Sequence, residues 1–213
     1  SVSAEKPNVL LIAVDDLRPQ ILSFGRAHMV TPNIDRFAGE SFDFTQAVAG
    51  TPVCCPYRGS LMTGQHPLTH GVFVNDVGIT SDAVPFAECL NRAGYDTMRT
   101  CKRGNSYEGA NKQFTVRHDA TKRGNTDGNG SEWHAGHAID SIDHWRTNHR
   151  PGGKPFLIYL GFSHPHDERN ARTTPALTGR YGCLNTTNPG SFANAPQVGG
   201  PLSFSSPDTP GMP

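Results

Sequence analysis

A continuous run of apolar residues from Val9 to Val14 predicts a strand near the start of the chain. The run has no polar alternation and stops abruptly at Asp15 and Asp16. Such a run is typical of a strand in a parallel sheet that is buried on both faces. The segment from Phe156 to Phe162 has the same pattern, so we expect at least two strands of this kind.

Helix and further strand patterns alternate between these two runs. Helices are expected from Pro32, from Pro56 and over Pro85–Ala93, and a fourth carries Ile139, Ile142 and Trp145 on one face. Additional strands are expected at Phe42–Val48 and Tyr95–Thr100, and the glycine-rich segment 105–132 is expected to be a long loop or lid. This alternation predicts an α/β fold, a mostly parallel β-sheet sandwiched by helices.

Composition argues against several classes of function. The 19 Lys and Arg residues only equal the 19 Asp and Glu residues, so the chain lacks the basic surplus that nucleic-acid binding requires. No apolar run approaches the roughly 18 residues that a membrane span needs. The five cysteines, with Cys54 and Cys55 adjacent, fit neither a disulfide framework nor a zinc site. The first four residues resemble the end of a trimmed signal peptide, so we expect an exported protein.

Polar residues follow the predicted strands at their carboxyl ends, where parallel sheets bind ligands. They are Asp15 and Asp16, Lys102, and the pair His164 and His166. Each cluster alone has an ordinary explanation, such as a turn or a surface lysine. The two histidines alternate along an extended segment and therefore point to opposite sides. Together the clusters predict a site at one edge of the sheet, where paired carboxylates suit a hard divalent cation.

The stretch from Cys54 to Gly64 carries the most specific signal. Cys54 comes just before a helix whose first turn contains Pro56, so its side chain lies in the positive field of a helix N-terminus, where anions bind. Arg58 is close enough in sequence to return toward the same spot. This arrangement suits a nucleophile that acts on an anionic substrate, and the alternative is a structural cysteine at a helix start.

This stretch resembles the signature of the type I sulfatases, a family of the alkaline phosphatase superfamily. That signature reads Cys-x-Pro-Ser-Arg followed by x-x-x-Leu-Thr-Gly. The positions in register are Cys54, Pro56, Arg58, Thr63 and Gly64, while Tyr57 replaces the serine and Met62 the leucine. The first strand with its two aspartates, the segment Thr31–Asp35 and the segment Phe162–His166 also match family motifs in order. The resemblance covers roughly residues 7 to 182.

The resemblance implies a sulfuric ester hydrolase that acts on a sulfated small molecule or a carbohydrate. Cys54 would be oxidised to Cα-formylglycine by a formylglycine-generating or anaerobic maturation enzyme. The hydrated aldehyde would supply the nucleophile. Asp15, Asp16 and the modified Cys54 would be ligands of Ca²⁺. A periplasmic or secreted location follows from the expected export.

Further roles are implied for the other matching residues. Arg58 would hold the nucleophile and the charge beside the metal, and Lys102 would contact the sulfate. His166 aligns better than His164 with the histidine that protonates the leaving alcohol. His164 would then be a substrate-side or structural residue. Gly104 stands where the family has a second histidine, so help in activating the nucleophile is missing at that position.

The later metal ligands and the later lysine of the family have no counterpart before Pro213. We therefore expect residues 1–183 to be the N-terminal part of a sulfatase catalytic domain, and a missing C-terminal chain is an implied partner. Residues 184–213 contain ten Gly or Pro and one charge, and they are expected to be an irregular tail. The alternatives are a phosphonate or phosphate ester hydrolase of the same superfamily, and an inactive truncated fragment that acts as a partner module. A redox role for Cys54 and Cys55 is disfavoured because adjacent cysteines rarely form an unstrained disulfide.

Overall fold

The computed structural model describes residues 6–15, 17, 21–25, 29–80, 82–102, 108–120, 131–148 and 153–162, without the side chains of Phe24, Lys102, Ala120 and Ser131. The chain divides into two compact units. The first contains Ser1–Asp16 and Gln46–Glu168, and the second contains Leu17–Thr45 and Arg169–Pro213. The expected boundary between residues 183 and 184 lies outside the described residues.

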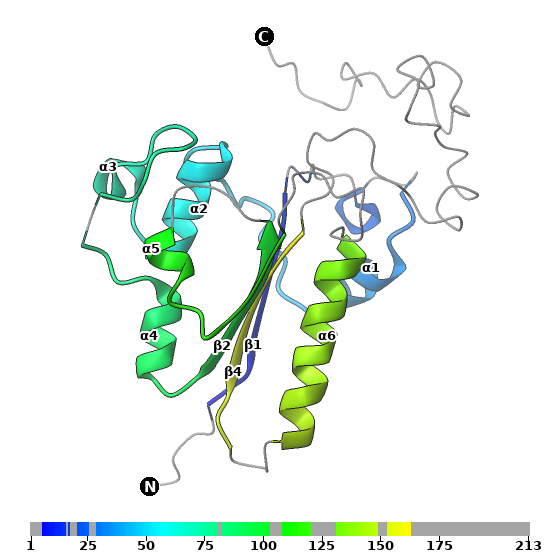
Figure 1. Cartoon of the computed structure of the whole chain (residues 1–213). Helices are drawn as coiled ribbons and strands as arrows, with labels where there is room; N and C mark the ends of the chain where they lie inside the picture. Colours follow the sequence, from blue (N-terminus) through cyan, green and yellow to red (C-terminus); the bar gives the residue numbers. More distant parts are fainter. Residues whose placement is uncertain are drawn as a thin grey trace, which may run out of the picture. The chain divides into compact units, whose positions relative to one another are not determined.

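A parallel β-sheet forms the centre of the first unit (Figure 1). Its described strands are β1 (Val9–Val14), β2 (Asp96–Lys102), β3 (Val116–Ala120) and β4 (Phe156–Phe162). Their order across the sheet is β1-β4-β2-β3, and every pairing is parallel. Because all of these strands run in one direction, their carboxyl ends lie along the same edge of the sheet.

Helices cover both faces of this sheet (Figure 1). One face carries α2 (Cys54–Thr63), α3 (Pro67–His70), α4 (Phe86–Arg92) and α5 (Glu108–Asn111). The other face carries α6 (Ser131–Asn148), which packs on β4 and β2. The prediction of an α/β sandwich is confirmed, with α2 beginning two residues before the expected Pro56.

Strand β4 separates two apolar cores, as its unbroken apolar sequence predicts. Its residues Leu157 and Tyr159 belong to the core beneath α2 and α4, together with Cys55, Met62 and Phe114. Ile158 and Leu160 belong to the core beneath α6, with Met98 and Ala138. The middle five residues of β4 are all buried, so this strand is covered on both faces.

Strand β1 is covered on one face only by the described residues. Val9, Leu11 and Ala13 pack against the core beneath α2. The alternate residues Leu10, Ile12 and Val14 are 47%, 51% and 36% exposed. In the described part of the chain β1 pairs with β4 alone, and α6 packs mainly on β4 and β2. The expectation that both faces of β1 are buried is therefore not met by these residues.

Two other expectations were wrong. Residues Phe42–Val48 form no strand but an irregular segment, in which Phe42, Phe44 and Val48 are exposed. The expected loop 105–132 contains α5 and the edge strand β3. Strand β3 is polar because its side chains form ion pairs rather than a core: Asp119 pairs with the buried Arg99 at 3.3 Å and with Arg117 at 2.7 Å.

The described part of the second unit contains the 3₁₀ helix η1 (Leu22–Phe24) and the helix α1 (Pro32–Gly39). Helix α1 begins at Pro32, as predicted, and Thr31 precedes it. The hydroxyl of Thr31 donates to the Asp35 carboxylate at 3.0 Å and accepts the backbone N–H of Leu22 at 3.2 Å. These bonds tie η1 to the start of α1.

Candidate active site

Cys54 and Asp15 meet at the carboxyl edge of the sheet. The backbone N–H of Asp15 donates to the Phe162 carbonyl at 3.1 Å, which extends the β1–β4 pairing by one residue and buries the aspartate. Helix α2 begins beside it, and the Cys54 thiol donates toward Asp15 Oδ1 across 3.8 Å. The predicted nucleophile and the first predicted metal ligand are therefore adjacent.

The start of α2 is fixed by backbone and side-chain bonds. Val53 is the extended N-cap residue, and Pro56 occupies the first turn, where its missing N–H costs nothing. The backbone N–H of Cys55 donates to the Asn75 side chain at 3.0 Å. The Cys55 side chain is fully buried and accepts the N–H of Asp76 at 3.4 Å. The helix start therefore holds Cys54 half-buried while its neighbour packs into the core.

Arg58 lies one turn into α2 and is 6% exposed. Its Nη2 lies 3.5 Å from Asp15 Oδ2, while its Nη1 donates to Tyr159 Oη at 2.7 Å and to Cys101 Sγ at 3.3 Å. Burial lowers the pKa of Arg58, but Tyr159, Cys101 and Asp15 together raise it above its ordinary value. The guanidinium therefore stays charged, which places a fixed cation beside Asp15.

The remaining predicted site residues are only partly described. Lys102 is the last residue of β2, so its backbone lies at the same edge of the sheet as Asp15, but its side chain is outside the description. Asp16, His164 and His166 lie outside the described residues altogether. The structure thus brings together Cys54, Asp15 and Arg58, and it leaves the other positions as predictions.

Tyr159 and Cys101 contact the site although sequence reasoning did not select them. Both are buried residues inside strands, Tyr159 in the apolar run of β4 and Cys101 in β2. A tyrosine inside a buried strand carries a hydroxyl that needs a partner. That requirement, together with the position of β4 directly before the predicted histidines, is the signal that could have identified Tyr159.

A metal ion would find some of its ligands here. Asp15 offers carboxylate oxygens, the ligands that Ca²⁺ prefers, at a buried position next to Cys54. Among the described side chains, no three His, Cys, Asp or Glu residues cluster closely enough to hold an ion. The chemistry of Asp15 and its place beside position 54 fit one side of a calcium site.

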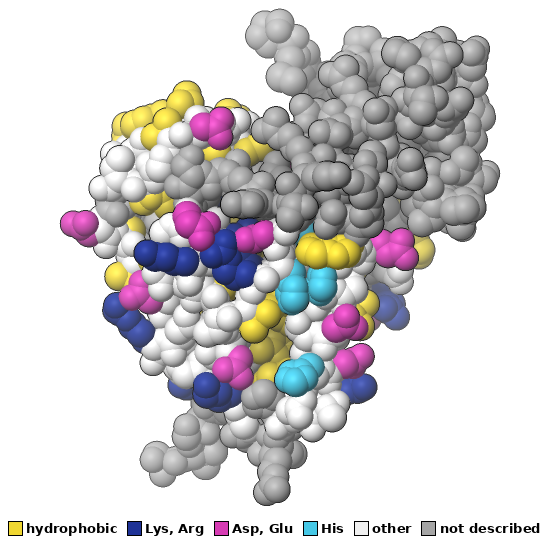
Figure 2. Space-filling view, in the orientation of Figure 1, with side chains coloured by type: hydrophobic (Ala, Val, Ile, Leu, Met, Phe, Trp, Pro, Cys, Tyr) yellow, Lys and Arg dark blue, Asp and Glu magenta, His cyan; other side chains and the backbone are white. Residues whose placement is uncertain are grey.

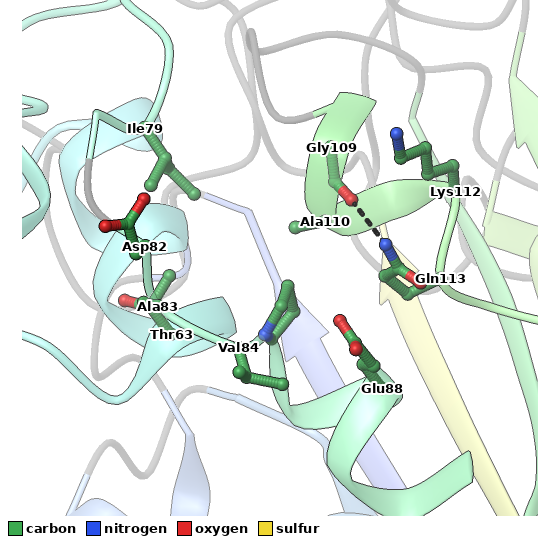
Figure 3. Close-up of a pocket in the computed structure, with 11 residues that line it drawn as sticks. Thr63, Ile79, Asp82, Ala83, Val84, Glu88, Gly109, Ala110, Lys112 and Gln113 are labelled. Atoms are coloured by element: carbon green, nitrogen blue, oxygen red, sulfur yellow. Dashed lines mark hydrogen bonds between the residues drawn. The ribbon is translucent and has the colours of Figure 1, made fainter. Parts of the chain in front are cut away.

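A separate pocket of about 380 Å³ lies at the other end of α2 (Figure 3). Its lining includes Thr63, Asp82, Glu88 and Lys112, and it contains none of the predicted site residues. Gln113 on this wall donates to the Gly109 carbonyl at 3.2 Å. Because Thr63 ends the helix that Cys54 begins, the pocket is not part of the candidate active site.

The described surface also bears on possible partners. Figure 2 shows Lys and Arg side chains interspersed with Asp and Glu over the described part of one face, without a broad patch of one sign. This part of the face therefore offers no basic stripe of the kind that follows a nucleic-acid backbone. None of the helices in the described ranges combines the length and apolar character needed to cross a bilayer.

Solved structures share this fold. Ps i-CgsB in complex with k-i-k-neocarrahexaose matches with a TM-score of 0.65 and 22% identity, over 78% of this chain and 47% of that chain. The phosphonate monoester hydrolase of Agrobacterium radiobacter matches with a TM-score of 0.61 and 23% identity, over 80% and 44% of the two chains. The parallel sheet with helices on both faces is thus a fold of the alkaline phosphatase type, as predicted.

Sequence comparison identifies the family within that class. The sulfatase family profile matches residues 7–193, and the chain belongs to the sulfatase family. An ulvan-active sulfatase from Formosa agariphila is 42% identical over 93 residues, which are 43% of this chain and 18% of the relative. Another sulfatase from this organism is 30% identical over 200 residues, with 76% and 39% covered. The chain spans less than half the length of these relatives.

Proposed function

We propose that the protein hydrolyses sulfate esters with the side chain at position 54 as the nucleophile. The observation that supports this most is the contact of Cys54 with Asp15, 3.8 Å apart, at the point where the buried Arg58 also reaches Asp15. Membership of the sulfatase family supports it further. A nucleophile, a carboxylate and a fixed cation in contact suit attack on an anionic ester.

The nucleophile would be formylglycine, made from Cys54 by a formylglycine-generating or anaerobic maturation enzyme. When hydrated, this group offers one oxygen for attack on sulfur and a second hydroxyl whose deprotonation expels sulfate. Asp15 Oδ1 would accept a hydrogen bond from the group at position 54 and so orient it, which the 3.8 Å contact with the Cys54 thiol supports. Arg58 offsets the negative charge that gathers beside Asp15.

Ca²⁺ would be the cofactor, held by Asp15, Asp16 and the group at position 54. When bound, it would screen the sulfate oxygens and favour the ionised nucleophile. Lys102 would contact the sulfate, and His166 would protonate the departing alcohol, with His164 on the substrate side or in a structural role. The position of Lys102 at the carboxyl end of β2 supports its assignment, because β1 presents Asp15 at the same edge.

The proposed substrate is a sulfated carbohydrate, and the proposed location is periplasmic or secreted. The relative that is 42% identical over 93 residues is an ulvan-active sulfatase, and the structural neighbour Ps i-CgsB was solved in complex with k-i-k-neocarrahexaose. Ulvan and neocarrahexaose are both saccharides. The two names therefore support a carbohydrate, rather than another sulfated small molecule, as the substrate.

The test is sulfate release after maturation. The protein is produced with a maturation enzyme, and mass spectrometry of the peptide Thr51–Arg58 checks that the thiol has become an aldehyde. Turnover of p-nitrophenyl sulfate and of sulfated oligosaccharides should then require calcium and should be lost in Cys54→Ala. Cys89→Ala, at an exposed cysteine in α4, is the matched control that should retain turnover. Confirmed aldehyde without calcium-dependent turnover would instead support an inactive partner module.

A second candidate is hydrolysis of phosphonate or phosphate esters. The observation that favours it is the fold shared with a phosphonate monoester hydrolase, at a TM-score of 0.61. Sulfate and phosphate esters differ little in shape, so the described residues fit both. The ratio of turnover on p-nitrophenyl sulfate, p-nitrophenyl phosphate and a phosphonate monoester decides between them.

A further inference from the structure

Arg58 is held by a side chain that the proposed mechanism does not use. Its two terminal nitrogens are divided between different partners. Nη2 faces Asp15 Oδ2 at 3.5 Å, while Nη1 donates to Tyr159 Oη at 2.7 Å. Cys101 Sγ also accepts from Nη1, at 3.3 Å. The bond to Tyr159 is shorter than the contact with Asp15, and it uses the other terminal nitrogen of the guanidinium.

The hydroxyl of Tyr159 is itself fixed in place. Tyr159 is fully buried in β4. Its ring stacks on that of Phe114, with 6.2 Å between the ring centroids, and packs edge to face with Phe86, with 6.3 Å between the centroids. Burial and the Cys101 thiol raise the pKa of Tyr159 above its ordinary value, although Arg58 and Arg99 act to lower it. The group is therefore a neutral phenol whose oxygen can accept from Arg58, and the packed ring leaves it little freedom to move.

We propose that Tyr159 is a positioning residue that holds Arg58 against Asp15 and so sets the electrostatic environment of position 54. The role of this environment in catalysis rests on the proposed function, whereas the positioning itself does not. Arg58 has a long, flexible side chain, and thiols are weak acceptors, so Cys101 alone would hold it loosely. Without the Tyr159 hydroxyl, Nη2 would leave Asp15 and the carboxylate charge would be less well offset.

The unmatured protein gives a direct test, because position 54 is then still a thiol. Iodoacetamide alkylates this thiol at a rate that depends on the charged groups facing it: Asp15 Oδ1 lies 3.8 Å from Cys54 Sγ, and Arg58 Nη2 lies 3.5 Å from Asp15 Oδ2. Tyr159→Phe keeps the packed ring and removes only the hydroxyl. It should slow alkylation of Cys54 about 3- to 10-fold at pH 8, the effect expected when a nearby charge is less well neutralised. Cys89 is exposed and far along the sequence in α4, so its rate is the internal reference.

Tyr95→Phe is the matched control, because Tyr95 is a buried tyrosine of the same core. It should leave the Cys54 rate unchanged. A purely structural role of Tyr159 predicts the opposite sign: loosening of the core would expose the buried Cys55 and Cys101 and would speed labelling of all three thiols. An unchanged or faster Cys54 reaction in Tyr159→Phe therefore overturns the positioning role.

Turnover separates this inference from the proposed function. In matured protein, Tyr159→Phe should lower kcat/KM for a sulfate ester about 10-fold or more, as expected for loss of a hydrogen bond to a charged group, and Tyr95→Phe should stay within about twofold. A wild-type protein without turnover, combined with slowed alkylation in Tyr159→Phe, overturns the proposed function and supports the positioning of Arg58. If the wild type is active but Tyr159→Phe leaves the alkylation of Cys54 unchanged, the proposed function is supported and the positioning role of Tyr159 is overturned.

Discussion

Gly161 of β4 lies directly against Cys101 of β2. A Cβ atom at position 161 would lie 3.1 Å from the Cys101 Cβ and would overlap its Sγ. The same sulfur accepts a hydrogen bond from Arg58. The absence of a side chain at position 161 therefore leaves room for the Cys101 side chain that contacts Arg58.

Gly161→Ala should therefore reduce stability and disturb Arg58 together. Overpacking of a buried position costs about 1–3 kcal/mol in the free energy of unfolding, because Cys101 has to shift. Urea unfolding measures this loss. Gly136→Ala in α6, where a Cβ would meet no atom within 4 Å, is the control and should raise stability by roughly 0.5–1 kcal/mol. Equal stability of Gly161→Ala and the wild type would contradict the close packing.

The buried pair Asp15 and Arg58 should contribute far more to stability than a surface pair. Asp15→Asn removes one charge and leaves the Arg58 guanidinium, 6% exposed, without its ionic partner. Breaking a buried pair in this way costs about 3 kcal/mol, even though replacing both partners can be neutral. Glu88→Gln, which breaks the solvent-exposed i,i+4 pair with Arg92, should cost less than about 0.5 kcal/mol. Urea unfolding of unmatured protein in EDTA compares the two variants. Equal losses in the free energy of unfolding would show that the buried pair contributes no more than the surface pair.

The predictable and unpredictable parts of the fold differ in how their residues are buried. β4 could be predicted because both of its faces contact apolar cores, which leaves an unbroken apolar run. β3 could not be predicted, because its side chains form ion pairs in place of apolar contacts. Arg117 pairs with Glu108, and Asp119 pairs with Arg99. Phe42–Val48 has the residue types of a strand but no strand beside it among the described residues, and residue type alone does not supply a pairing partner.

The candidate site was predictable to the extent that its residues stand at the ends of elements. Asp15 ends a strand and Cys54 begins a helix, and in a parallel sheet these ends converge. Tyr159 stands in the middle of β4, three residues before Phe162, the last predicted strand position, so its pattern is that of a core residue. Its contact with Arg58 arises because the long Arg58 side chain reaches from α2 to the middle of β4. A local sequence pattern does not predict such a contact between distant elements.

A buried histidine makes stability depend on pH. His70 of α3 is fully buried, and its Nδ1 accepts the Val72 N–H at 3.2 Å. The proton is therefore on Nε2, which lies 3.0 Å from Ser60 Oγ. Burial lowers the pKa of His70 below its ordinary value, and the nearby His66 lowers it further. Backbone hydrogen bonds oppose this shift but do not cancel it. The folded state then binds fewer protons than the unfolded state.

Stability should consequently fall as the pH drops through the ordinary histidine pKa of about 6.5, and it should level off below the lowered folded-state pKa. The stabilising contribution is complete above this range. Urea unfolding at pH 7.5 and 5.5 measures the difference. His70→Gln should flatten the dependence even if it lowers stability at both pH values, while His144→Gln, at an exposed position of α6, should leave it intact. A pH dependence that His70→Gln does not reduce would assign the effect to other groups, such as His118, whose pKa is also lowered by burial and by His137.

A buried hydrogen bond joins the sheet to α6. Thr100 Oγ1 of β2 lies 2.7 Å from His134 Nδ1 of α6, and both residues are fully buried. Thr100→Val keeps the shape of the side chain and removes the hydroxyl, so the imidazole nitrogen loses this partner. Loss of a partner for a buried polar group costs about 1–3 kcal/mol.

Thr147→Val, at an exposed threonine of α6 whose hydroxyl donates to the Asp143 carbonyl, should cost less than about 0.5 kcal/mol. Hydrogen exchange of α6 amides should accelerate in Thr100→Val and not in Thr147→Val, and an unchanged exchange pattern would mean that apolar packing alone holds the helix on the sheet.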